Sequence, residues 1–313
     1  MGDKAGMIVL SDNLKGAALM SGSMAAFVVN DTLMKLASAH FPLFQALTLR
    51  GLFATTLIGL IAWHRGQLLV PIARADRRII GLRTVGELGA TVCFLTALFN
   101  MPLANVTAIL QAAPLAVTLG AAFFLGQKVG WRRYSAISAG FVGVLIIVRP
   151  GAEGFNAFAG LALVAVLFIV LRDLSTRQLS PSIPSIQVAL ITAVSVTCLG
   201  ALLAPTQDWA PITMPGLVYL ASAACFLIFG YLFSVMTMRT GEIAFVSPFR
   251  YTVLLWAMLL GYIVFGEVLD TSALIGSAVI VVTGIYSFHR ERKRRIQDRE
   301  PPPVPVPPRG APR

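Results

Sequence analysis

Ten apolar runs of about 20 residues follow one another along this chain, and they limit its fold more than any other feature. Each run is long enough for one α-helix to cross a hydrocarbon core roughly 30 Å thick, and most connections are short. The sequence therefore predicts an all-α polytopic membrane protein with ten transmembrane helices. The predicted spans are residues 14–37, 41–63, 80–99, 103–125, 131–149, 155–177, 184–204, 213–237, 243–265 and 271–289.

Composition agrees with a chain that lies mostly in lipid. Of the 313 residues, 57% are hydrophobic and only 12% are charged, whereas soluble domains carry about 25% charged residues. The net charge of +11 comes from basic residues between the apolar runs and near the C-terminal end. Because that placement suits anionic headgroups and topology signals, we expect membrane lipids as partners and no nucleic acid.

Cysteine and histidine give no sign of a cofactor or a catalytic centre. Cys93, Cys198 and Cys225 lie inside apolar runs without paired spacing, and the three histidines show no metal-ligand spacing. Neither a nucleophile elbow nor a phosphate-cradling loop is present in the sequence. We therefore expect no cofactor, no metal and no catalytic residue.

Lysine and arginine gather in alternate loops, which predicts the orientation. Basic residues fill 65–83, 128–133, 177 and 239, whereas the opposite loops hold a single one, Arg149. By the positive-inside rule, both termini are cytoplasmic and the protein lies in a plasma or bacterial inner membrane. Residues 1–13 and the basic, Pro-rich tail 290–313 are then cytoplasmic, and residues 66–83 are predicted to be an interfacial loop. Residues 301–313 are predicted to be a disordered polyproline-like end that either is passive or binds a partner.

The second half of the chain repeats the first. VVNDTLMK (28–35) matches VLRDLSTR (170–177) at an offset of 142, and residues 103–127 resemble 243–267 at an offset of 140. The repeats are residues 14–149 and 155–289, each with five spans. Since five is odd, the second copy enters the bilayer upside down. The prediction is thus two inverted five-helix repeats, a plan that secondary transporters use.

Both copies carry an acid and a base four residues apart. Asp31 and Lys35 lie near the external face, and Asp173 and Arg177 near the cytoplasmic face. At this spacing each acid is expected to neutralise its own base on one helix face. The four residues are candidates for charge pairs or gates, with direct contact to substrate or proton as the alternative.

Other ionisable residues lie deeper in the spans. Arg50 and Arg250 are too far from the span ends to reach the interface, so each should face protein or water. Arg250 is suited to hold a carboxylate or a phosphate, and Glu87 or Asp31 to take a cationic group or a coupling proton. The alternative is that such Arg–Glu pairs only bind helices together.

The Pro-containing fourth-type helices and the stretches FLGQKVGWRR and VFGEVLD resemble the EamA branch of the drug/metabolite transporter superfamily over residues 14–289. VVNDTLMK and LTLRG are similar to the group that holds S-adenosylmethionine carriers. The resemblance implies a central cavity bordered by the third, fourth, eighth and ninth helices. Its lining candidates are then Glu87, Gln111, Tyr231, Arg250 and Tyr251, with Arg50 added from its depth. One departure is Gln127, which stands where the second half has Glu267.

Taken together, these features favour a secondary transporter of a small polar or amphipathic metabolite, for example one that is amino-acid-like, S-adenosylmethionine-like or vitamin-like. The alternatives are a membrane enzyme acting on lipid-linked substrates and a noncatalytic membrane scaffold. The sequence leaves open the substrate, the direction, a coupling proton or ion, and whether the protein is a monomer or a homodimer.

Overall fold

The computed structural model describes residues 2–68, 71–126, 130–148, 157–180, 182–240, 243–268 and 271–297. Within these ranges the chain is all helical, with no strand. The helices are α1 (Gly2–Ala37), α2 (Leu43–His64), α3 (Arg74–Asn100), α4 (Leu103–Leu110), α5 (Ala113–Leu125), α6 (Trp131–Val148), α7 (Ala157–Thr176), α8 (Ser185–Leu203), η1 (Ala204–Thr206), α9 (Met214–Thr240), α10 (Ile243–Val246), η2 (Ser247–Tyr251), α11 (Thr252–Phe265) and α12 (Thr271–Gln297).

Eight helical segments of the described chain are long and apolar enough to cross a membrane, counting Leu103–Leu125 as one. Two shorter apolar helices, Tyr134–Val148 and Thr271–Tyr286, occupy the positions of the fifth and tenth predicted spans. The structure thus confirms an all-helical chain with several membrane-length apolar helices.

Two predicted spans are interrupted, and each interruption lies at a proline. Pro114 follows the break between α4 and α5, and Pro248 lies in the 3-10 turn η2 between α10 and α11. Proline lacks the N–H that the carbonyl four residues earlier needs, so the α-helical ladder cannot continue through it unchanged. Both interrupted spans then end at a left-handed glycine, Gly126 with φ 62° and Gly266 with φ 65°, a conformation that glycine adopts without strain.

Three boundaries differ from the sequence prediction. Residues 74–83, expected as part of an interfacial loop, form the first turns of α3. The helix α12 continues to Gln297, into the segment expected as a tail, and α1 begins at Gly2. The added turns of α3 and α12 are rich in arginine, and a hydropathy pattern marks only the apolar part of such a helix. The proline-rich stretch 301–313 lies outside the described residues.

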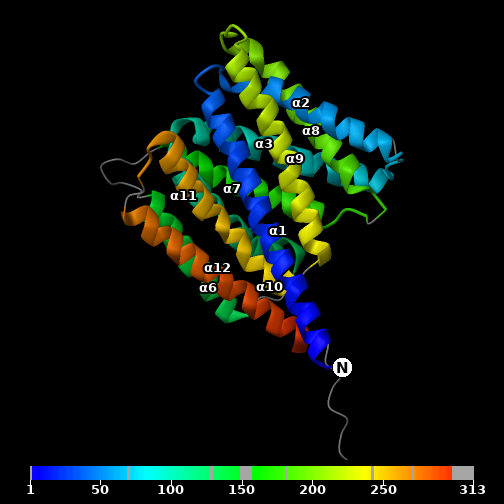
Figure 1. Ribbon diagram of the computed structural model, residues 1–313, viewed down its shortest axis with the longest axis vertical. Helices are drawn as coiled ribbons and strands as arrows, with labels where there is room; N and C mark the ends of the chain where they lie inside the picture. The colour runs from blue at the N-terminus through cyan, green and yellow to red at the C-terminus, as the bar shows by residue number, and fades with distance from the viewer. Residues whose placement is uncertain are drawn as a thin grey trace, which may run out of the picture.

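Helices far apart in sequence form the main packing pairs. In Figure 1, α1 lies beside α9, α2 beside α8, and α6 beside α12, and α3 packs on α7. The start of α1 and the end of α12 lie at one end of the molecule, here called the terminal end. The end where α1 stops and α4 begins is called the opposite end. The interior between the pairs holds the polar groups described next.

Candidate functional site

At the opposite end, Lys35 on α1 and Glu267 just after α11 form a salt bridge, with Nζ 2.5 Å from Oε1. The ammonium also donates to the carbonyl oxygen of Met101, at 2.7 Å, and its Nζ lies 4.9 Å from the centroid of the Phe265 ring. The second carboxylate oxygen of Glu267 accepts the backbone N–H of Leu103 at 2.7 Å. We call these five residues the end clasp. It joins α1, the start of α4 and the end of α11.

Local structure explains how the end clasp forms. After the left-handed turn at Gly266, the backbone N–H of Glu267 bonds to the carbonyl of Gly261, which directs the chain back over the helix end. Leu103 is the first residue of α4, where backbone N–H groups have no partner within the helix. An acid near a helix start and a base near a helix end are both favoured by the helix dipole, and Glu267 and Lys35 occupy such positions.

The expected pairing of Lys35 with Asp31 is wrong. Lys35 instead pairs with Glu267, which lies 232 positions away, and the two side chains are only 14% and 15% exposed. Asp31 accepts a hydrogen bond at 2.8 Å from the side-chain amide of its neighbour Asn30. The i, i+4 spacing of Asp31 and Lys35 does not determine which acid binds Lys35, because helix packing brings Glu267 from the other half of the chain into contact with it.

Deeper in the bundle, Arg50 on α2 meets Asn30 and Asp31 on α1. Its Nη2 donates to Oδ1 of Asn30 at 2.9 Å, and Asn30 is 4% exposed. Asp31 and Arg50 interact electrostatically without forming a direct ion pair in the described chain. The Asn30 amide therefore links the two charges.

Next to this group, Glu87 on α3 lies between two arginines. Its Oε2 is 3.8 Å from Arg83 Nη2 on the same helix and 3.7 Å from Arg172 Nη1 on α7. Arg83 also donates to the hydroxyls of Thr176, at 3.1 Å, and Thr192. Glu87 is thus shared between two bases.

Asp173 pairs with Arg172 rather than with Arg177, which corrects the second expected pair. Arg172 Nε donates to Asp173 Oδ1 at 2.8 Å, and Arg177 lies exposed just beyond α7. We call these seven residues the central cluster: Asn30, Asp31, Arg50, Arg83, Glu87, Arg172 and Asp173.

The close contact of α3 with α7 depends on Gly86. A Cβ atom at this position would lie 2.7 Å from the backbone nitrogen of Arg172, closer than real Cβ atoms approach. Without that atom, the α3 backbone can approach α7 closely enough for Glu87 to face Arg172. The small size of Gly86 is therefore what allows Glu87 and Arg172 to lie close together.

Tyr231 on α9 borders the central cluster. The charged groups around its hydroxyl are Glu87, Arg172, Arg83 and Arg50, and its ring packs edge-on against Phe27 at 5.5 Å between centroids. It is nevertheless 50% exposed. Tyr231 thus combines interaction with interior charges and an accessible surface, as a residue lining an interior passage would.

The other predicted lining residues are not joined to the central cluster by any contact within the described part of the chain. Tyr251 is buried, and its hydroxyl lies against Gly284 of α12. Arg250 is exposed on η2, and Gln111 lies half-buried at the break between α4 and α5. The structure therefore brings together Arg50, Glu87, Asp31 and Tyr231 from the predicted set.

Sequence reasoning missed Asn30, Arg83, Arg172 and the role of Glu267 in the clasp. Arg83 and Arg172 had signals that could have found them. Both lie about one helical turn or less from a predicted acid, Glu87 or Asp173.

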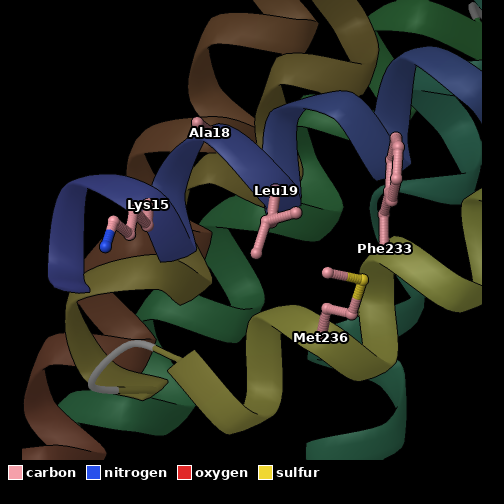
Figure 2. A pocket seen from close by; sticks show the side chains of 5 residues that line it. All are labelled: Lys15, Ala18, Leu19, Phe233 and Met236. Atoms are coloured by element: carbon pink, nitrogen blue, oxygen red, sulfur yellow. The ribbon is translucent and has the colours of Figure 1, made fainter.

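A groove also lies between α1 and α9, outside the central cluster. Its volume is about 510 Å³, and it is lined by Lys15, Ala18, Leu19, Phe233 and Met236. Figure 2 shows Leu19 and Met236 facing each other across it, with the Lys15 amino group at one side. Because four of the five lining residues are apolar, this groove is a poorer site for a polar ligand than the central cluster.

Comparison with known proteins places this geometry in context. The EamA-like transporter family model matches residues 14–149. The chain is 22% identical to an S-adenosylmethionine uptake transporter of Rickettsia felis, over 93% of this chain and 98% of that protein. It is 24% identical to a riboflavin transporter of Vibrio cholerae, over 91% and 97%, and 24% identical to a pseudopaline exporter of Pseudomonas aeruginosa, over 88% and 96%.

A solved crystal structure of a protein 16% identical in sequence superposes with a TM-score of 0.61, covering 89% of this chain and 99% of that one. At this identity the likeness shows the fold alone. Together with the family match over residues 14–149 and the nearly full-length relatives, these findings confirm the resemblance of the chain to the EamA branch of the drug/metabolite transporter superfamily.

Proposed function

We propose that this protein is a secondary transporter that moves a small polar or amphipathic metabolite across the plasma or bacterial inner membrane by alternating access. The observation that carries the proposal is the central cluster, in which one group of ionisable side chains on α1 and α2 lies near a second group on α3 and α7 inside an apolar bundle. Ionisable groups at membrane depth are costly and usually mark a substrate or ion pathway. The relatives' names as transporters of S-adenosylmethionine, riboflavin and pseudopaline support the same class.

The proposal includes ten membrane spans in two inverted repeats, 14–149 and 155–289. Several contacts support this arrangement because they recur when the halves are exchanged. Phe27 packs on Gly230 between α1 and α9, and Phe168 packs on Gly89 between α7 and α3, with both members shifted by 141 positions. The pairs α2–α8 and α6–α12 map onto themselves under the same exchange. An exchangeable pattern of this kind is expected of two structurally related halves.

With both termini cytoplasmic, the end clasp lies at the external face and the terminal end at the cytoplasmic face. The clasp then closes the external side. On α9, Leu220 and Ala224 toward the external side are buried, whereas Tyr231 and Val235 toward the cytoplasmic side are half exposed. These exposures favour a state closed to the outside in which the central cluster is reached from the cytoplasm.

Flux measurements on proteoliposomes test the proposal. Wild-type protein should move at least one radiolabelled metabolite from a panel that includes S-adenosylmethionine and riboflavin, and an imposed gradient should drive it. Glu87→Gln should lower the flux at least about tenfold, because it removes the carboxylate that Arg83 and Arg172 share and leaves Arg83 without an acid partner among the described residues. Arg65→Gln, at an exposed position just after α2, is the matched control and should transport normally.

A gradient-independent chemical change of a lipid-linked substrate in detergent would contradict the proposal. So would the absence of driven flux across the whole panel with correctly folded protein.

A further inference from the structure

The guanidinium of Arg50 is oriented by a hydrogen bond to a buried side chain. Its Nη2 donates to Asn30 Oδ1 at 2.9 Å, and the Asn30 amide donates to Asp31 Oδ1 at 2.8 Å. Asn30, which links the two charges, is 4% exposed and therefore held by packing. The guanidinium is thus preorganised before any ligand arrives.

One donor of this fixed guanidinium has no acceptor among the described residues. Nε of Arg50 is buried and lacks a hydrogen-bond partner there. The other two arginines of the central cluster differ: Arg172 Nε bonds to Asp173 at 2.8 Å, and Arg83 Nε bonds to Thr176 at 3.1 Å. A buried donor on a charged group is costly to leave unpaired. A ligand acceptor that bonds to Arg50 Nε would remove that cost and so bind favourably.

The charges around the guanidinium favour an anion over a cation. Asp31 reaches Arg50 only through the Asn30 amide and forms no direct ion pair with it in the described chain. Glu87, which also interacts electrostatically with Arg50, is shared by Arg83 and Arg172. The acids are therefore engaged, and within the described part of the chain the buried donor of the cluster that lacks an acceptor belongs to a cation. A guanidinium fork matches the two oxygens of a carboxylate.

From these contacts we propose that Arg50 is the carboxylate-binding subsite of the transport pathway, and that the substrates of this protein carry a carboxylate which bonds to its free Nε side. This inference rests on the proposed function, whose substrate class it narrows. It transfers the anion-binding role expected of Arg250 to Arg50, which has the fixed orientation and the unpaired buried donor.

Matched ligand pairs test the subsite in the full-length protein in nanodiscs. The probes are S-adenosylmethionine against its decarboxylated analogue, and methionine, glutamate and citrate against their amides. Thermal unfolding is followed because a ligand that binds only the native state raises the midpoint. At least one carboxylate should raise the midpoint of wild type while its partner without the carboxylate does not. The shift should vanish in Arg50→Gln, shrink in Arg50→Lys, which keeps the charge but loses the fork, and persist in Arg65→Gln.

Asn30→Ala is a second variant that leaves Arg50 in place. It should weaken the carboxylate shift by releasing the guanidinium, and the midpoint without ligand reports whether each variant folds. The proposal is overturned if a pair shifts equally, if Arg50→Gln keeps the shift, or if no carboxylate stabilises the wild type. If the same preparation transports a neutral or cationic metabolite without a carboxylate along an imposed gradient, this inference is overturned. The proposed transporter function would remain supported.

Discussion

The two ends of the bundle differ in one residue that the repeat would otherwise equate. At the opposite end, Lys35 binds Glu267 inside the end clasp. Their counterparts in the other half are Arg177, at an offset of 142, and Gln127, at an offset of 140. Gln127 lies outside the described residues, but its neutral amide cannot form a salt bridge. Lys35 and Glu267 therefore form a salt bridge at one end, and the equivalent residues of the other half, Arg177 and Gln127, cannot form one.

This difference indicates how a near-symmetric carrier acquires a resting state. If the halves were identical, closures at the two ends would have equal strength and the two states equal energy. An added salt bridge at one end favours the state in which that end is closed. We therefore expect a resting protein that is closed at the end clasp, and the following variants test this comparison.

Glu267→Gln should have the largest effect. It leaves the Lys35 ammonium without its acid in a site where the two side chains are only 14% and 15% exposed, at an expected cost of about 2–4 kcal/mol to the closed state. Ala104→Cys on α4, buried at that end, is the reporter in a background without Cys93, Cys198 and Cys225. Labelling of this reporter by a membrane-impermeant maleimide from outside should accelerate at least about tenfold.

The double variant Lys35→Met/Glu267→Met controls for the unpaired charge. Because it buries no lone ammonium, the Ala104→Cys reporter should react more slowly in it than in Glu267→Gln. Equal labelling of Glu267→Gln and the parent protein would contradict a closing role for the clasp.

Gly89→Ala and Gly230→Ala should come next and should resemble each other. A Cβ would lie 2.5 Å from the Phe168 ring in the first case and 2.8 Å from the Phe27 ring in the second. Overpacking of this kind costs about 1–3 kcal/mol. Thermal unfolding of both variants should show similar losses if the halves are related by the repeat, and a loss confined to one variant would count against equivalent contacts.

Gln127→Glu should have the smallest effect. It should favour closure of the terminal end, whereas the end clasp favours closure of the opposite end. The repeat predicts that an acid at position 127 pairs with the exposed Arg177, which would add about 0.2–1 kcal/mol to closure of the terminal end. The expected result is slower labelling of Val235→Cys from the cytoplasmic side, by up to about fivefold. Faster labelling would refute a direct pair between the new acid and Arg177. With Arg177→Gln added, the proteins with and without Gln127→Glu should be labelled at the same rate, and this result would support that pair.

Much of the fold could be predicted from the sequence because one physical requirement determines it. An apolar run of membrane length must be helical, so the helices were expected. The breaks next to Pro114 and at Pro248 were not, because spans 103–125 and 243–265 were predicted as continuous helices. The helical turns 74–83 and 290–297 were not expected, because polar turns that extend a membrane helix resemble loops in hydropathy.

The site was only partly predictable. Depth in the span predicted that Arg50 and Arg250 face protein or water. Arg50 bonds to the buried Asn30 of α1, whereas Arg250 is exposed on η2. The partners could not be found from spacing on one helix: Lys35 pairs with Glu267 from the other half, and Asp173 with its neighbour Arg172. Which acid meets which base depends on how α1, α3 and α7 pack, and that is long-range information.

Topology mapping tests the central claim most directly, because alternating access as proposed requires the two halves to be inverted. Trp131, at the start of α6, and Val268, after α11, are both exposed and follow corresponding helices of the two repeats. In sealed cells, Trp131→Cys should react with an impermeant maleimide only from the cytoplasmic side, and Val268→Cys only from the external side. Reaction of both cysteines from the same side would contradict the inverted arrangement and the carrier mechanism built on it.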